Sequence, residues 1–229
     1  MSTEFNQPPR YDDHDADLRA RSRPRGIAMS ILVITWAAAV TGGLGVLWSY
    51  EHQPGWSHAS PQKWPQTTQL IDAQNRPTLV MFVHPKCPCS RASIGELARI
   101  MTQCRDKMQT IAVYVKPRQC SGDPHWEQTD LWSSAAQIPG VTTVLDTDGV
   151  EAKRFGAETS GWCMLYDRDG HLQFSGGITP SRGHSGDNLG HSTIVSFLSR
   201  GTTDVHRAQV YGCDLETNMT QGANQCCQK

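Results

Sequence analysis

Two cysteines separated by one proline are the residues of this chain with the clearest capacity for chemistry. Cys87, Pro88, Cys89 and Ser90 follow the apolar run 77–83 and precede apolar residues with helical spacing. A cysteine between a strand and a helix faces unpaired backbone N–H groups and the positive end of the helix dipole, which stabilise a thiolate. Because the thiolate is the reactive form, the pattern predicts Cys87 as a nucleophile and Cys89 as the nearest resolving thiol.

The neighbouring residues favour the same interpretation. Lys86 and Arg91 place positive charge on both flanks, and Pro88 suits a first helical position, where no N–H donor is needed. A disulfide between Cys87 and Cys89 would close a small, strained ring and would be more oxidising than a Cys-x-x-Cys bond. The alternative without chemistry is a pair of inert cysteines at the end of a strand.

A metal site is a second interpretation of the same cysteines. The sulfur atoms of Cys87 and Cys89 are soft ligands that suit Cu(I). A histidine from elsewhere in the chain would complete the site, and His184 and His191 are the candidates, with His84 only three residues from Cys87. The chain would then be a tethered metal-binding assembly factor. The redox interpretation needs neither a metal nor another resident cofactor.

The glycine-rich segment 175–191 precedes the last predicted helix and is the next candidate site. It lacks the glycine and lysine spacing of a phosphate-binding loop. As a plain connection, it would use Asp187 or Asn188 to cap the helix. As a loop that faces a substrate, it would use Arg182 and His184.

The elements that must position these residues alternate along the chain. Short apolar runs predict strands at 77–83, 110–115, 141–145, 162–166 and 171–174. Helical spacing predicts helices at 92–101, 126–138, 150–155 and 192–198. Asp169-Gly170 between the last two strands predicts a hairpin. The order predicts an α/β fold, with a mixed sheet between helices and the cysteines where a strand meets a helix.

The cysteine segment resembles a known family. The stretch from Phe82 to Ala92, together with 144–149, 155–157 and 165–170, is similar to membrane-anchored thioredoxin-like proteins of the TlpA and ResA type. The strings around the cysteines and at 175–179 also resemble the RedB group. The resemblance covers about residues 70–200. It implies a thioredoxin-like fold, thiol–disulfide oxidoreductase activity, a protein thiol or disulfide as client, and a thiol electron donor in the membrane.

The sequence also departs from the family pattern. In an alignment without gaps, Cys87 takes the first cysteine position and Ser90 the second, so Cys89 is an additional thiol. The family's cis-proline position falls on Gly161. Cys163 follows two residues later and is a further candidate for a resolving partner. These departures also allow a redox-silent thioredoxin-like binding domain.

The run 26–50 predicts a transmembrane helix. It contains no Asp, Glu, Lys, Arg or His, and about 20 such residues span a bilayer. Four arginines lie between residues 19 and 25, whereas no Lys or Arg follows the run until Lys63. The positive-inside rule then predicts a cytoplasmic N-terminus and a periplasmic or otherwise extracytoplasmic main domain, with Trp48 and Tyr50 at the far interface. We expect an uncleaved signal-anchor, with a cleaved signal peptide as the alternative.

The chain accordingly divides into five predicted parts. These are a cytoplasmic polar tail at 1–25, a transmembrane signal-anchor at 26–50, a tether at 51–66, a thioredoxin-like domain at 67–200, and a cysteine-containing C-terminal tail at 201–229.

Composition limits the partners. Lys and Arg total 21 against 22 Asp and Glu, so a nucleic-acid partner is not expected. All eight cysteines follow the apolar run, as suits export to an oxidising compartment. The pairing of the six outside the motif cannot be deduced from spacing; they are Cys104, Cys120, Cys163, Cys213, Cys226 and Cys227.

Overall fold

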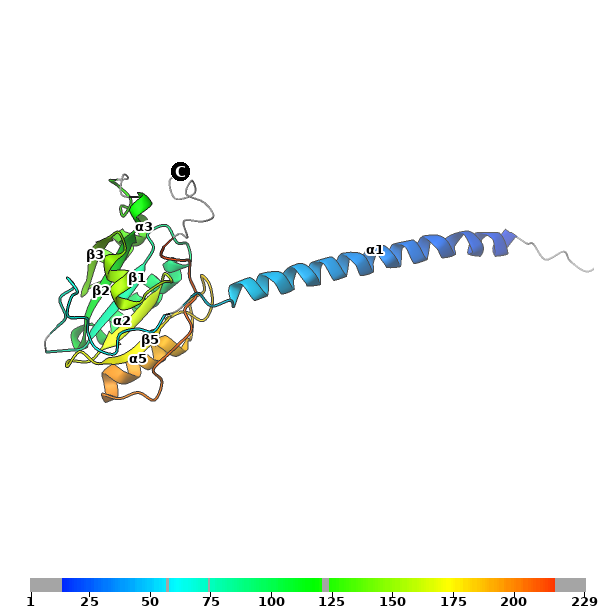
Figure 1. Cartoon of the computed structure of the whole chain (residues 1–229). Coiled ribbons are helices and arrows are strands. Elements are labelled where there is room, and N and C mark those ends of the chain that lie inside the picture. Colours follow the sequence, from blue (N-terminus) through cyan, green and yellow to red (C-terminus); the bar gives the residue numbers. More distant parts are fainter. Residues whose placement is uncertain (1–13, 57, 74, 121–123, 217–229) are drawn as a thin grey trace, which may run out of the picture. The chain divides into compact units, whose positions relative to one another are not determined.

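The computed structural model describes residues 14–216, except 57, 74 and 121–123. The chain divides into two compact units, residues 1–50 and 51–229. The first contains the helix α1 (His14–Glu51), and the second contains the sheet, the remaining helices and all the predicted site residues (Figure 1).

Helix α1 is long and apolar enough to span a membrane. The qualifying part is Gly26–Glu51, with a mean hydropathy of 1.9, and its side chains are exposed. The helix begins at His14, so it extends upstream of the predicted boundary at residue 26. Alanine, leucine and arginine in the polar segment favour this extension, whereas Pro24 within it removes one N–H donor.

The second unit is built on a five-stranded mixed sheet. Its strands are β1 (Thr78–Val83), β2 (Gln109–Lys116), β3 (Val141–Thr147), β4 (Trp162–Tyr166) and β5 (Leu172–Gly176). Their order across the sheet is β3-β2-β1-β4-β5. Strand β1 runs parallel to β2 and antiparallel to β4, and all its residues are buried. A buried central strand explains why its sequence is continuously apolar rather than alternating.

Helices flank this sheet in the predicted order. They are α2 (Ser90–Cys104), α3 (Asp130–Ala136), α4 (Val150–Phe155) and α5 (Leu189–Arg200), with short 3₁₀ helices η1 (Arg105–Lys107) and η2 (Arg118–Cys120). The apolar residues of α2 and α5 pack on one face of the sheet, and those of α4 on the other. This mixed sheet between helices confirms the predicted thioredoxin-like fold.

Helix α3 is shorter than the predicted 126–138. The hydroxyl of Thr129 accepts a hydrogen bond from the backbone N–H of Trp132 and caps the helix there. Upstream, the buried indole of Trp126 donates to the carbonyl of Val115 at 3.2 Å. This anchor to β2 holds the chain outside the helix, so apolar spacing alone overestimated its length.

The predicted hairpin between β4 and β5 is confirmed. The Asp167 carboxylate accepts hydrogen bonds from the N–H groups of Asp169 and His171, both at 2.9 Å. Gly170 has φ +76°, a conformation that favours glycine. These local interactions set the antiparallel pairing that the Asp-Gly pair predicts.

Parts of the predicted tether and C-terminal tail pack against the domain. Trp64 is buried, and its ring meets the rings of Phe155 and Tyr166 edge-on, with centroids 5.3 and 5.2 Å apart. Val210 and Leu215 are buried in the same core. Apolar residues in two largely polar segments thus hold both segments on the domain, and the orange-to-red chain beside β5 in Figure 1 is the second of them.

Candidate active site: three cysteines from two segments

The turn between β1 and α2 carries Cys87, Pro88 and Cys89. The N–H of Cys87 donates to the carbonyl of His84, and the N–H of Ser90 donates to the carbonyl of Cys87, both at 3.1 Å. The N–H of Ala92 donates to the carbonyl of Cys89 at 3.2 Å. These bonds extend the helical turn ahead of α2, so Cys87 and Cys89 lie at its N-terminal end, as their spacing predicts.

A third cysteine reaches this turn from the C-terminal segment. The Sγ atoms of Cys87 and Cys213 lie 2.8 Å apart and are hydrogen-bonded. Cys89 completes a group in which the three Sγ atoms lie within 4.8 Å of one another. Cys87 is buried, whereas Cys89 and Cys213 are partly exposed, so the cluster opens to the surface on the side of these two thiols.

Backbone contacts fix Cys213 in this position. The N–H of Ser160 donates to the carbonyl of Cys213 at 2.8 Å, and the N–H of Leu215 donates to the carbonyl of Glu158 at 2.7 Å. A Cβ atom on Gly212 would lie 2.0 Å from the carbonyl oxygen of Ser160, so only glycine allows this close approach. Because the side chain of Leu215 is fully buried, the segment is anchored on both sides of Cys213.

Cys87 is the thiol of the cluster that ionises. Its pKa is lowered to about 4, first because the Cys213 side chain hydrogen-bonds to its sulfur, against the opposing effect of burial. Hydrogen bonds from the Ser90 hydroxyl and from the backbone N–H groups of Cys213 and Ser90 lower it further. Cys87 is therefore a thiolate at neutral pH, and a thiolate is the nucleophilic form.

The two neighbouring thiols stay protonated. The pKa of Cys213 is raised strongly, first because its S–H donates to Cys87 and then through burial. Burial and the charge on Cys87 also raise the pKa of Cys89, whereas the positive charge of Arg182 lowers it. One thiolate thus lies beside two thiols, which is the charge distribution that a stepwise thiol exchange needs.

Ser160 connects the three segments of the site. Its hydroxyl accepts a hydrogen bond from the N–H of His84 at 2.7 Å and lies 2.6 Å from the hydroxyl of Ser90. Its own N–H holds the carbonyl of Cys213. Ser90, at the family's second cysteine position, therefore has two roles: it bonds to Ser160 and it lowers the pKa of Cys87.

Gly161 lies where the family's cis-proline position was predicted, beside this network. Its N–H donates to the carbonyl of Phe82 at 2.8 Å, which ties the loop to the end of β1. Its φ is +92°, and a Cβ atom there would lie 2.8 Å from the hydroxyl oxygen of Ser93 on α2. The conformation thus favours glycine at this position, whereas the Ser93 hydroxyl could rotate away from a Cβ atom.

The predicted flanking cations lie in the site region but contact other groups. The Lys86 ammonium lies 3.9 Å from the centre of the Trp126 ring. Arg91 forms an exposed ion pair with Asp130 at the start of α3. The lowered pKa of Cys87 is due instead to Cys213 and Ser90.

One residue of the predicted substrate loop, Arg182, contacts the segment that carries Cys213. Arg182 donates from Nη1 to the carbonyl of Gly212 at 2.5 Å, directly before Cys213. His184 lies 2.8 Å through Nδ1 from the carbonyl of Arg182 and is exposed. Asn188, one of the two expected caps, does cap α5, because its side chain accepts from the N–H of His191 at 2.8 Å.

The histidines considered as metal ligands lie outside the three-sulfur group. His191 lies 3.0 Å through Nδ1 from the buried carboxylate of Glu96 on α2. Among the residues that the structure describes, the one group of three or more ligand side chains close enough to share a metal ion is Cys87, Cys89 and Cys213.

The other cysteines of the described chain lie in the interior. Cys163 is fully buried, its S–H donates to the carbonyl of Gly161, and burial raises its pKa strongly. Cys104 and Cys120 are also buried. Cys226 and Cys227 lie outside the described residues.

Cys213 and Ser160 are the site residues that sequence reasoning missed. Cys213 is 126 positions from Cys87, in a segment without strand or helix periodicity. The available signals were Val210 and Leu215, two apolar residues that flank Cys213 in a polar region. They indicate that the segment is packed, although they do not indicate against which surface.

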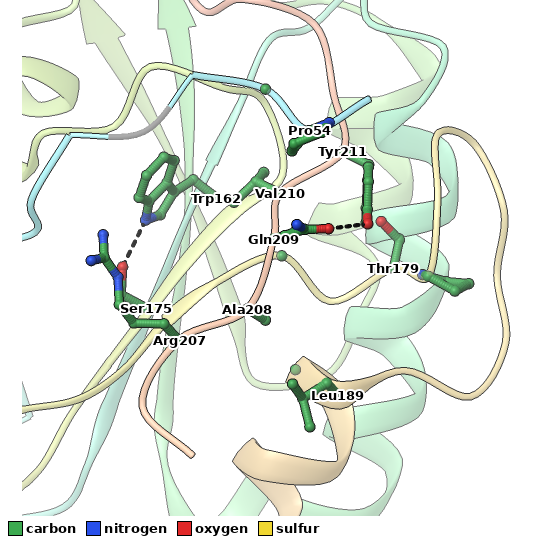
Figure 2. Close-up of a pocket in the computed structure, with 14 residues that line it drawn as sticks. Pro54, Trp162, Ser175, Thr179, Leu189, Arg207, Ala208, Gln209, Val210 and Tyr211 are labelled. Carbon is green, nitrogen blue, oxygen red and sulfur yellow. Dashed lines mark hydrogen bonds between the residues drawn. The ribbon is translucent and has the colours of Figure 1, made fainter. Parts of the chain in front are cut away.

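A pocket lies beside the segment that carries Cys213. Its lining includes Trp162 of β4, Ser175 of β5, Leu189 of α5 and residues 207–211 of the segment. Figure 2 shows the Trp162 indole directed at the Ser175 hydroxyl, which are 3.0 Å apart, and Tyr211 near Gln209. None of the three cluster cysteines lines this pocket, so it is separate from the sulfur site.

Comparisons with known proteins support the fold. No family model and no curated protein matches the chain. An uncharacterised conserved protein of Geobacillus kaustophilus has a similar solved structure, with a TM-score of 0.57, 16% identity, and coverage of 73% of this chain and 98% of that one. A hypothetical protein of Sinorhizobium meliloti has a TM-score of 0.56 and 16% identity, with coverage of 71% of this chain and 98% of that one. A thioredoxin-like protein in its oxidised form has a TM-score of 0.44 and 18% identity, with coverage of 62% of this chain and 97% of that one.

These likenesses concern the fold. At this level of identity the first two show that the domain shares its architecture with solved bacterial proteins. What the site does must therefore be argued from its own sulfur atoms.

Proposed function

We propose that this chain is a thiol–disulfide oxidoreductase with Cys87 as its nucleophile. The observation that carries the proposal is a buried thiolate at the N-terminal end of α2, with a pKa of about 4 and two further thiols beside it. The Cys87 thiolate attacks one sulfur of a client disulfide and releases the other as a thiolate, which takes up a proton. The mixed disulfide between Cys87 and the client is then resolved by a second thiol.

The atypical Cys-Pro-Cys-Ser motif fits this chemistry in a modified form. Ser90 cannot resolve a mixed disulfide, but its hydroxyl stabilises the attacking thiolate. The resolving thiol must then be Cys89 or Cys213, whose Sγ atoms both lie within 4.8 Å of that of Cys87. A dithiol donor, for which we propose a membrane protein, would reduce the resulting disulfide.

The test is insulin reduction by the purified full chain with dithiothreitol as reductant. We expect Cys87→Ser to abolish catalysis above the uncatalysed rate. Cys104→Ala, which removes a thiol at the opposite end of α2, should retain it. Equal activity of the Cys87→Ser and wild-type proteins would refute the proposal.

The place of action is part of the proposal. Helix α1 would anchor the chain in a membrane, with the domain in the periplasm or another extracytoplasmic space. The support is the apolar stretch Gly26–Glu51, the arginines before it, and the absence of Lys and Arg between residues 26 and 62. Disulfide exchange would then take place in an oxidising compartment.

The three-sulfur cluster also favours a second candidate function, the binding of Cu(I). Thiolates are soft ligands, and Cys87, Cys89 and Cys213 lie close enough to bind one ion together. The ligand set would then differ from the cysteine–histidine set expected from sequence. Anaerobic titration with Cu(I) against a chromogenic chelator tests it: retention of one ion per chain, lost in Cys89→Ser, would favour metal delivery over redox exchange.

A further inference from the structure

We propose that Cys213 is the resolving thiol of Cys87, so that the oxidised protein contains a Cys87–Cys213 disulfide joining the helix α2 turn to the C-terminal segment. This inference rests on the proposed function and identifies the second catalytic residue of the same site. It differs from the pair that the sequence motif favours, Cys87 with Cys89.

Cys213 lies close enough to Cys87 for a disulfide to form with little movement. The Sγ atoms of Cys87 and Cys213 are 2.8 Å apart, against about 2.05 Å in a disulfide bond. Bond formation thus requires a sulfur movement of less than 1 Å. Cys87 and Cys89 are two residues apart in one turn, and their ring would be small and strained.

Backbone contacts on both sides of Cys213 hold it in this position. Backbone hydrogen bonds join Ser160 to Cys213 and Leu215 to Glu158, and Gly212 lies against the Ser160 carbonyl. A thiol positioned in this way needs little reorganisation before it attacks, which favours an intramolecular step over attack by an outside thiol.

The resolving step balances as follows. The Cys213 sulfur attacks Cys87 Sγ in the mixed disulfide, and the bond between Cys87 and the client sulfur breaks. The client leaves as a thiolate and takes up the proton that Cys213 releases. The client disulfide has gained two electrons, and the two cysteines of the site have lost them.

The experiment follows the cysteines through one turnover. The fully reduced full chain reacts with one equivalent of 5,5′-dithiobis(2-nitrobenzoate), followed by acid quenching and digestion with trypsin and a glutamate-specific protease. Cleavage after Lys86 and Arg91 gives a peptide with Cys87 and Cys89. Cleavage after Arg207 and Glu216 gives one with Cys213, free of Cys226 and Cys227.

The expected result in the wild-type protein is a disulfide that joins peptide 87–91 to peptide 208–216, with fragmentation placing it on Cys87 rather than Cys89. Cys213→Ser should retain the thionitrobenzoate adduct on Cys87 and clear it at least tenfold more slowly than the matched variant Cys89→Ser. Cys213→Ala, with circular dichroism as the folding check, separates loss of the thiol from loss of structure. The position of the disulfide in the wild-type protein is a test that does not depend on how any variant folds.

Two other outcomes separate the two proposals. A disulfide within peptide 87–91, with the adduct retained in Cys89→Ser but cleared in Cys213→Ser, would overturn the role of Cys213 and leave the oxidoreductase proposal intact. If Cys87 forms neither an adduct nor a disulfide, the proposed function itself fails, and the inference with it.

Discussion

At the scale of the residue, the reactivity of Cys87 depends on neighbours that are distant in sequence. Its pKa is lowered to about 4, from an ordinary value of 9.0, chiefly by the Cys213 side chain. The cations on either side in sequence, Lys86 and Arg91, contact Trp126 and Asp130 instead. The charge of the nucleophile is thus a property of the folded site.

The first prediction concerns pH. Because only the thiolate is alkylated, the rate at Cys87 should rise with pH around a midpoint of about 4 and be level by pH 6. The measurement is iodoacetamide labelling of the reduced chain over pH 3–9, with peptide 87–91 followed by mass and Cys87 separated from Cys89 by fragmentation. A midpoint near 9 would contradict the lowered pKa.

The second prediction ranks the causes of that low pKa. Cys213→Ala and Ser90→Ala should both raise the pKa of Cys87, with Cys213→Ala giving the larger rise, because the Cys213 side chain is the largest cause. A hydrogen bond to a charged group is worth about 1.5–3 kcal/mol, or about 1–2 pKa units. Arg91→Ala, which removes a flanking charge paired elsewhere, is the control and should change the midpoint little.

At the scale of the element, glycines stand where the segments of the site approach one another closely. Gly212 of the C-terminal segment lies against Ser160, and Gly161 lies against Ser93 of α2. These contacts place Cys213 over the turn that carries Cys87. The site is therefore assembled by backbone proximity as much as by side chains.

The third prediction tests that proximity at Gly212. A Cβ atom there would overlap the Ser160 carbonyl, so Gly212→Ala should displace the segment at a cost of about 1–3 kcal/mol. We expect a higher pKa of Cys87 and slower Cys87–Cys213 disulfide formation after oxidation with diamide. Gly201→Ala is the control on the same segment: its Cβ would meet no atom within 4 Å, so Cys87 should keep its pKa.

The fourth prediction concerns Gly161. Gly161→Ala would place a side chain at φ +92° and force the Ser93 hydroxyl, 2.8 Å from the new Cβ atom, to rotate, so it should lower the free energy of unfolding by about 1–3 kcal/mol. Gly183→Ala shares a positive φ, +71°, but meets no neighbouring atom, and should cost only about 1 kcal/mol. Urea unfolding of both variants measures the difference; equal losses would mean that the Ser93 contact is not limiting.

The elements were more predictable than the site because their signals are local. The apolar run of β1, the helical spacing of α2 and the Asp-Gly pair before β5 each lie within a few residues of the structure they specify. The position of Cys87 and Cys89 in the turn before α2 was predictable for the same reason. Cys213 and Ser160 belong to irregular segments, and tertiary packing alone places them beside Cys87.

At the scale of the whole molecule, the chain combines a long apolar helix with a thioredoxin-like domain. The part of α1 with sufficient hydropathy is Gly26–Glu51, and the domain follows directly in sequence. If α1 spans a membrane, the side on which the domain lies decides whether the cysteines meet an oxidising environment.

The fifth prediction addresses this topology. The arginines before Gly26 should retain the N-terminus in the cytoplasm. Alkaline phosphatase fused after Lys229 should therefore be active, and a fluorescent reporter that matures only in the cytoplasm should be dark. The reverse pattern would place the domain in the cytoplasm and remove the oxidising compartment from the proposal.

The distance of Cys213 from Cys87 along the chain has a consequence for biosynthesis. The thiol that most lowers the pKa of Cys87 comes 126 residues later, on a segment that docks against residues 158–160. While the chain is being made from its N-terminus, the newly emerged Cys87 lacks that partner, so we expect its pKa to lie nearer that of a free thiol. We therefore expect Cys87 to become fully reactive toward disulfides only after the C-terminal segment has emerged and docked.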